Sequence, residues 1–316
     1  MLLLRAFKSE NHFWKYLVGS ILIIIASTVG QLPLMGIVMA KLVAEGKGFY
    51  NLDETSFMTV LDKNLTLFLI LFSFLVALGA IYLVLKFLHK QTLLDIITIR
   101  KKLDWKRVFF AFSIWGIFQI IVTIISYYVA PEDFVLNFKP VQFGILAVIA
   151  ILMIPIQTSV EELVFRGYLM QGFGLLAKNK WFPLLMTSLI FGLMHLANPE
   201  VEKMGYITMV YYIGTGLFLG ILVLMDDGLE LSLGFHAANN LFAALLVTSD
   251  WTAFQTYSIL KDVSQPEAGF EIVFPVLVIF PILLFVFAKK YNWTNWKQKL
   301  TGKLIVTPEV INVEND

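Results

Sequence analysis

The chain has 316 residues, of which 58% are hydrophobic and only 15% are charged, and its mean hydropathy is +0.78. A soluble domain of this length carries far more charge, so the composition indicates a polytopic membrane protein. The absence of cysteine excludes disulfides, thiolate nucleophiles and cysteine-bound metals, and a net charge of +1 gives no indication of a nucleic-acid partner.

Apolar stretches long enough to cross a bilayer recur along the whole chain. They predict an all-α, polytopic membrane helix bundle with about eight transmembrane helices, at residues 16–40, 65–85, 108–130, 143–166, 181–197, 206–225, 231–248 and 272–288. The fourth apolar run continues to Ala177, so we expect that helix to be tilted, broken near Pro155 or continued along the inner surface. In the sixth helix, Gly216 and Gly220 have the spacing that lets two membrane helices pack closely.

Lys and Arg are concentrated in alternate loops, which sets the expected orientation. With the N-terminus inside, the inner segments carry most of these residues. We therefore expect a multi-pass protein of a bacterial plasma membrane with both termini in the cytoplasm. One inner turn departs from this pattern, because it contains Asp226, Asp227 and Glu230 and no basic residue.

The chain divides into three expected regions. Residues 1–142 hold the N-terminal transmembrane helices, residues 143–248 form a core with the unusual polar residues, and residues 249–316 hold an outer loop, the last transmembrane helix and a cytoplasmic tail. Within the first region, the inner segment 86–107 mixes Leu and Ile with Lys and Arg. This mixture favours either an amphipathic helix on the cytoplasmic leaflet or an ordinary basic connector.

Glu161 and Glu162 are adjacent acids within an otherwise apolar stretch. Ionisable groups inside a membrane are costly, and those that persist usually have a function. Glu162 and Arg166 are four residues apart with the acid first, so they are expected to pair on one helix face. Glu161 then lies on an adjacent face without a local counter-charge, which makes it the better candidate for a general base.

Two histidines also lie within apolar segments. Phe191 precedes His195 by one helical turn and is expected to pack beside its imidazole. His236 and Asn240 are likewise one turn apart, and together they present two donors suited to a developing oxyanion. Asn239 is expected to be a supporting polar residue. Each feature alone has a purely structural explanation, but the clustering of such residues on three of the last five helices favours a shared site.

These motifs resemble those of the CPBP family, which includes the type II CAAX prenyl proteases, bacteriocin-processing enzymes and Abi proteins. The resemblance rests on Glu-Glu-x-x-x-Arg at 161–166, Phe-x-x-x-His at 191–195 and His-x-x-x-Asn at 236–240, in family order, and it covers about residues 155–245. It implies an intramembrane endopeptidase with its catalytic core at 143–248. By this resemblance, Glu161 and His195 would activate water, His236 and Asn240 would stabilise the oxyanion, and Glu162 with Arg166 would support the site.

The sequence leaves the cofactor open. Either none is required, or a divalent metal such as zinc binds Glu161, His195 and His236; the zinc motif HExxH is absent. In upright helices Glu161 and His195 would lie at different depths, so we expect a tilt or a displaced helix to bring them together.

The expected partners are the lipid bilayer and a hydrophobic or lipidated peptide substrate, with no nucleic acid. An alternative function is a non-enzymatic immunity protein or regulatory partner of a transporter or sensor. Proton-coupled transport would use similar buried residues, but such proteins usually show internal repeats, which the sequence lacks.

Overall fold

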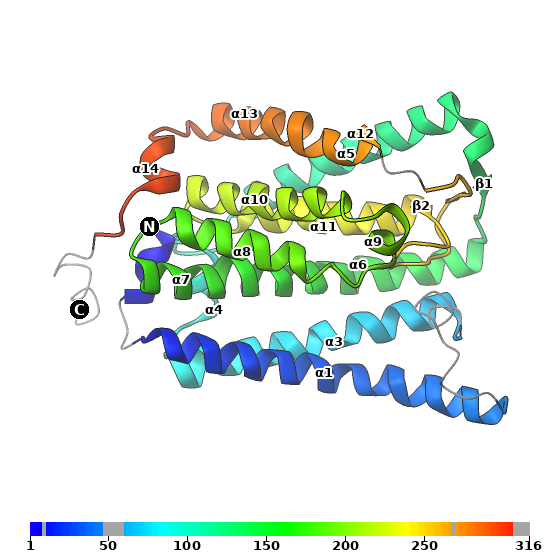
Figure 1. Cartoon of the computed structure of the whole chain (residues 1–316), viewed down its shortest axis with the longest axis horizontal. Helices are drawn as coiled ribbons and strands as arrows, with labels where there is room; N and C mark the ends of the chain where they lie inside the picture. Colours follow the sequence, from blue (N-terminus) through cyan, green and yellow to red (C-terminus); the bar gives the residue numbers. More distant parts are fainter. Residues whose placement is uncertain (8–10, 47–59, 267–268, 306–316) are drawn as a thin grey trace.

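The computed structural model describes residues 1–7, 11–46, 60–266 and 269–305. Figure 1 shows long helices that run roughly along one common axis. The helical elements are η1 (Leu2–Phe7), α1 (Phe13–Ala44), α3 (Lys63–Leu83), η3 (Val84–His89), α4 (Leu93–Ile97), α5 (Trp105–Val129), η4 (Pro131–Asp133), α6 (Pro140–Glu162), η5 (Leu163–Leu169), α7 (Met170–Ala177), α8 (Trp181–Leu193), α9 (Pro199–Met204), α10 (Thr208–Asp226), α11 (Glu230–Leu246), α12 (Phe270–Phe274), η6 (Pro275–Ile279), α13 (Phe280–Tyr291) and α14 (Trp296–Thr301).

The strands are few and short. They are β1 (Phe134–Leu136), β2 (Val247–Thr248) and β3 (Leu260–Asp262), in the order β1-β3-β2. β1 pairs with β3 in antiparallel fashion and β2 pairs with β3 in parallel. This small sheet ties together the connections at the end of the bundle opposite α14 (Figure 1). The prediction of an all-α membrane helix bundle is therefore confirmed.

Each of the eight predicted spans coincides with a helix. Within the described residues, six helical runs are long and apolar enough to cross a membrane: Phe13–Ala44, Lys63–His89, Trp105–Val129, Pro140–Ala177, Thr208–Asp226 and Phe270–Tyr291. The other two, α8 and α11, have 13 and 17 residues. α11 packs on α5 and α6, and α8 packs on α10, so both short helices are supported by protein neighbours.

The fourth predicted span is one continuous helical run, α6–η5–α7, of 38 residues. Pro155 lies inside α6 and does not break it; prolines are tolerated in membrane helices because neighbouring groups compensate for the lost hydrogen bond. A run of this length extends about 57 Å, almost twice the hydrocarbon core of a bilayer. Its end, α7, packs against α8 and η1 at the end of the molecule where the chain begins.

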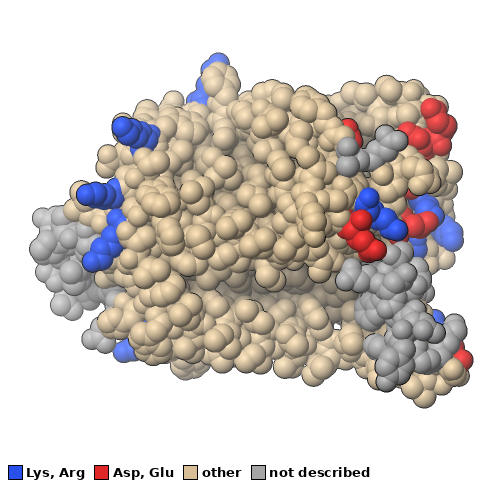
Figure 2. Space-filling model, in the orientation of Figure 1, with Lys and Arg blue, Asp and Glu red and all other residues tan. Residues whose placement is uncertain are grey.

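The outer surface of the bundle between its two ends is apolar. In Figure 2 the visible charged side chains lie at the two ends, and a broad uncharged band separates them. Large hydrophobic side chains are exposed on the outer helices, among them Ile24 on α1 (61% exposed), Ile117 on α5 (57%) and Phe285 on α13 (69%). Such a band matches the lipid-facing belt of an integral membrane protein.

The segment 86–107 does not form the amphipathic helix that its composition favours. Its helical parts are the end of η3, the five-residue α4 and the start of α5, and Thr98 forms an isolated β-bridge with Gly228. Ile96 and Thr98 are completely buried. The segment therefore folds into the end of the bundle, because its Leu and Ile side chains find protein rather than lipid to pack against. The prediction of a surface helix is wrong, and the connector interpretation fits.

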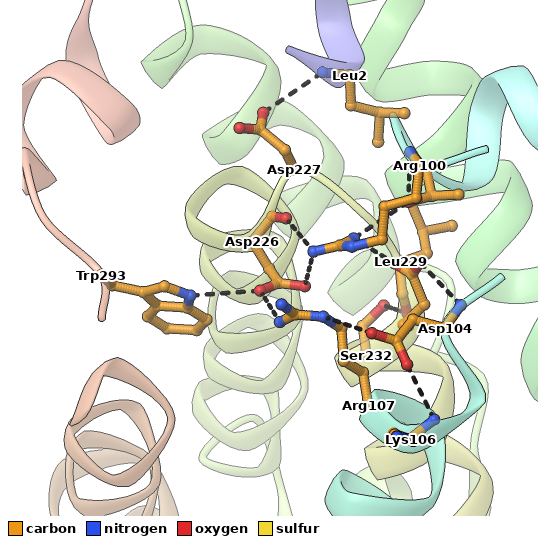
Figure 3. Close-up of polar contacts among 12 residues, drawn as sticks. Leu2, Arg100, Asp104, Lys106, Arg107, Asp226, Asp227, Leu229, Ser232 and Trp293 are labelled. Carbon is orange, nitrogen blue, oxygen red and sulfur yellow. Dashed lines mark hydrogen bonds and ion pairs between the residues drawn. The ribbon is translucent and has the colours of Figure 1, made fainter. Parts of the chain in front are cut away.

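The acidic turn between α10 and α11 is neutralised by bases from that same segment (Figure 3). Arg100 pairs with Asp226 and with Glu230, each at 3.0 Å, and Arg107 pairs with Asp226 at 2.5 Å. Trp293 also donates its indole N–H to Asp226, at 3.4 Å. We call Arg100, Arg107, Asp226 and Glu230 the end cluster. It joins α5, α10 and α11 at the end of the bundle that holds α14.

The neighbouring acid of this turn binds the chain ends. Lys299 of α14 forms an ion pair with Asp227, and the backbone N–H of Leu2 donates to the same carboxylate at 3.4 Å. Leu3 and Leu304 both contact Gly174 of α7. The first and last described segments are thus anchored together; the tail beyond residue 305, part of the predicted region 249–316, lies outside the described residues.

Candidate active site

The predicted site residues come from four elements. Glu161 and Glu162 end α6, Arg166 lies in the π-helical turn η5, His195 follows α8 by two residues, and His236 lies on α11. Asn240, one turn further along α11, is the sixth predicted residue.

Glu162 and Arg166 pair as their spacing predicts. Both side chains are fully buried, and Arg166 Nη1 donates to Glu162 Oε1 at 3.0 Å. Arg166 Nη2 donates to the backbone oxygen of Gly216 at 3.3 Å, and the guanidinium lies 4.2 Å from the centre of the Phe191 ring. This arrangement depends on close packing of α8 and α10, since a Cβ on Gly216 would lie 2.9 Å from the Ser188 carbonyl oxygen.

Glu161 has a different environment. Its side chain is 17% exposed, whereas that of Glu162 is 0% exposed. The amide of Gln157, one turn earlier on α6, donates to Glu161 Oε1 at 2.6 Å. Of the two adjacent acids, only Glu161 can therefore be reached by water.

His236 lies between the two acids. Its Nδ1 is 2.9 Å from Glu162 Oε1 and its Nε2 is 3.4 Å from Glu161 Oε2. Because a carboxylate only accepts hydrogen bonds, Nδ1 must carry a proton and donate to Glu162. Glu162 therefore holds both Arg166 and His236, which fixes the orientation of the imidazole.

His195 contacts residues of α8 and α10. Its Nδ1 donates to the Phe191 carbonyl oxygen at 2.7 Å, so Nε2 of the neutral ring is left with a free lone pair. The imidazole packs beside Phe191, with ring centres 4.8 Å apart, as predicted. It also stacks on Tyr212 of α10 at 4.3 Å, and the edge of Phe191 faces His236, with ring centres 6.0 Å apart.

The expected difference in depth between Glu161 and His195 disappears because α7 and α8 are joined by a short turn. Glu161 lies 16 residues before Ala177, about 24 Å along the helix, and His195 lies 14 residues after Trp181, about 21 Å along the chain. The two side chains are linked through Phe191 and His236: the Phe191 ring centre lies 4.8 Å from that of His195 and 6.0 Å from that of His236, whose Nε2 is 3.4 Å from Glu161 Oε2. The long α6–η5–α7 run therefore provides the displacement that the sequence requires.

Asn240 points toward α6, where its Nδ2 donates to Gln157 Oε1 at 3.1 Å. Asn239 supports it, since its own Nδ2 donates to Asn240 Oδ1 at 3.0 Å. Gln157 and Tyr212 are not among the predicted site residues. Gln157 is one turn before Glu161, so the same four-residue spacing that links the other pairs would have found it. No pattern in the sequence indicates the stacking of Tyr212.

In the described part of the chain, no group of three His, Asp or Glu side chains is placed to hold a metal ion. His236 uses Nδ1 on Glu162 and His195 uses Nδ1 on a backbone carbonyl, so each imidazole presents only Nε2 to the site.

The part of the chain that contains the six predicted site residues matches a known protein family. Residues 140–242 match the model of the type II CAAX prenyl endopeptidase Rce1-like family. The chain is also similar to the uncharacterized protein YyaK of Bacillus subtilis (strain 168), with 28% identity over 297 residues that cover 94% of this chain and 97% of that protein. No solved structure matches the chain. The resemblance that the motifs indicate is thus confirmed.

Proposed function

We propose that this membrane protein is an intramembrane endopeptidase, because residues 140–242 match the model of the type II CAAX prenyl endopeptidase Rce1-like family. The observation that carries the proposal is the pairing of one water-accessible acid, Glu161, with two imidazoles and a carboxamide around it. Its substrate would be a hydrophobic or lipidated peptide that reaches the site from the bilayer.

In the proposed reaction, Glu161 accepts a proton from a water molecule that also donates to the free Nε2 of His195. The water oxygen attacks the carbonyl carbon of the peptide bond and forms a tetrahedral oxyanion. Glu161 then returns the proton to the leaving nitrogen as the C–N bond breaks, which gives a carboxylic acid and an amine. The side chains supply every proton transfer that hydrolysis needs.

The oxyanion would be stabilised by donors on α11. Asn240 uses one N–H on Gln157, and its second N–H is available. When its ring is protonated, His236 donates with both nitrogens, Nδ1 to Glu162 and Nε2 on the side of the site where Glu161 lies. Preorganised donors in a site shielded from bulk water stabilise such a charge strongly. Glu162 and Arg166 would support the site by holding His236.

The test compares the purified chain with its Glu161→Gln variant on a panel of hydrophobic and prenylated peptides. Glutamine has the shape of glutamate but cannot accept the proton, so cleavage should fall by about 10²- to 10⁴-fold. Glu132→Gln, on the exposed turn η4, is the matched control and should cleave at the wild-type rate. Equal cleavage by the wild type and Glu161→Gln would eliminate Glu161 as the base, and a folded wild type that cleaves no peptide would contradict the protease proposal.

A further inference from the structure

A chain of side-chain hydrogen bonds runs from α5 through α11 to Glu161. Trp115 Nε1 donates to Asn239 Oδ1 at 3.0 Å, and Asn239 Nδ2 donates to Asn240 Oδ1 at 3.0 Å. Asn240 Nδ2 then donates to Gln157 Oε1 at 3.1 Å, and Gln157 Nε2 donates to Glu161 Oε1 at 2.6 Å. We call these five residues the amide chain.

The chemistry of its two ends fixes the direction of the amide chain. An indole N–H can only donate, and an ionised carboxylate can only accept. Each of the three carboxamides between Trp115 and Glu161 therefore has one orientation that satisfies both of its neighbours. Gln119 strengthens this, since its Nε2 also donates to Asn239 Oδ1, at 3.1 Å. Every donor in the series consequently points along the chain toward Glu161.

We propose that Gln157 is a positioning residue that couples the base to the oxyanion donor; this inference rests on the proposed function. Gln157 fixes Glu161 through Oε1 and leaves Oε2 toward His236. It also fixes Asn240 with its NH₂ group, rather than its oxygen, directed to α6. Turning Asn240 around would bring two carbonyl oxygens together and remove the donor for the oxyanion.

Because Gln157 is buried, water cannot readily take over the hydrogen bonds that it makes. Gln157 is only 4% exposed, although it lies on a helix that borders the site. A hydrogen bond to an ionised group contributes more than one between neutral groups, and it favours the charged form of the acceptor. The bond from Gln157 therefore holds the Glu161 carboxylate in one orientation, with Oε2 directed to His236.

The effect of Gln157 has to be judged among the other charges that face Glu161. These are Glu162 and Arg166 on its own helical run, His195 after α8 and His236 on α11. Gln157 itself is uncharged, so replacing it by an apolar residue changes no formal charge at the site. A change in kcat would then report the two lost hydrogen bonds and not an altered charge.

The experiment uses Gln157→Met, which has a similar length and no amide. The value of kcat should fall by about 10- to 100-fold with KM little changed, because the two lost hydrogen bonds orient the base and the oxyanion donor and do not bind the substrate. Gln142→Met makes the same change nearer the start of α6, away from the site, and should retain the wild-type kcat and KM. An unchanged kcat, or a fall in the rate that comes entirely from a higher KM, would overturn the inference.

A second readout separates this inference from the proposed function. The hydrogen bonding of the Glu161 carboxylate can be followed by infrared spectroscopy of protein labelled with ¹³C-glutamate, using Glu161→Gln to identify its band. Gln157→Met should shift the carboxylate stretching band even if no peptide is cleaved, and an unchanged band position would overturn the inference. If Gln157→Met unfolds more easily than the wild type, Gln157→Asn replaces it, because the shorter amide cannot reach Glu161, and the same shift is expected.

Discussion

At the scale of single residues, the two adjacent acids have opposite environments. A step of one residue rotates a side chain by about 100° around a helix, and here that step separates a fully buried acid from one that is 17% exposed. Glu162 binds Arg166 and His236 and is shielded from water, whereas Glu161 borders the site. One helical turn therefore provides both a structural anion and a candidate proton acceptor.

The buried pair allows a stability prediction. Arg166→Met removes the cation and leaves the Glu162 carboxylate in a fully buried position without its permanently charged partner, so unfolding should become easier by about 3 to 5 kcal/mol. The double variant Glu162→Gln/Arg166→Met removes both charges and should lose less. Denaturant unfolding in detergent micelles measures both variants. A double variant less stable than Arg166→Met would contradict the idea that the unpaired charge causes the loss.

The sequence predicts local pairs of this site but not the contacts between helices. Glu162–Arg166 and Phe191–His195 follow from the four-residue spacing, which places side chains on one helix face. The position of His236 between two acids does not follow, because 74 residues separate it from Glu162. The stacking of Tyr212 on His195 is equally a result of how α8 and α10 pack.

At the scale of elements, the π-helical turn η5 connects the site to the end of the bundle. Such wider turns within α-helices often occur at functional sites. Arg166 of η5 points into the site, and Tyr168, two residues later, bonds to His89 at 2.8 Å. The next residue after Arg166, Gly167, lies against Ile96 of α4. A single short turn thus contacts both the site and the segment that precedes α5.

Gly167→Ala tests this contact. The added Cβ would lie 2.9 Å from the Ile96 carbonyl oxygen, so the variant should lose roughly 1 to 3 kcal/mol of stability and displace η5. Gly79→Ala is the matched control, since no atom lies within 4 Å of its Cβ position, and it should be neutral or slightly stabilising. Thermal unfolding and the cleavage rate are measured together. If Gly167→Ala matched Gly79→Ala in both, η5 would not be held by this contact.

The helix positions could be predicted from hydropathy, whereas the packing of segment 86–107 could not. Apolar runs of about 20 residues need no knowledge of their neighbours, and each predicted run coincides with a helix. In 86–107, the mixture of Leu, Ile and basic residues suits either a lipid surface or a protein surface. Ile96 is buried and Arg100 pairs with Asp226 and Glu230 because other segments supply the partners, and composition contains no information about them.

At the scale of the whole molecule, the end that holds α14 is held together by charges distant in sequence. The turn with Asp226, Asp227 and Glu230, which lacks basic residues of its own, is neutralised by Arg100, Arg107 and Lys299. This turn departs from the excess of Lys and Arg expected in inner segments, but basic residues from elsewhere in the chain neutralise its acids in the folded structure. Both described chain ends lie at this same end, so the excess of Lys and Arg there supports our proposal that the termini are cytoplasmic.

The absence of cysteine makes this orientation directly testable. Lys297→Cys places one thiol on α14, and Glu132→Cys places one on η4 at the opposite end; both positions are exposed. A membrane-impermeant maleimide applied to intact cells should label the cysteine at 132, and should label that at 297 only after permeabilisation. The reverse labelling pattern would show that the end with α14 faces the outside of the cell.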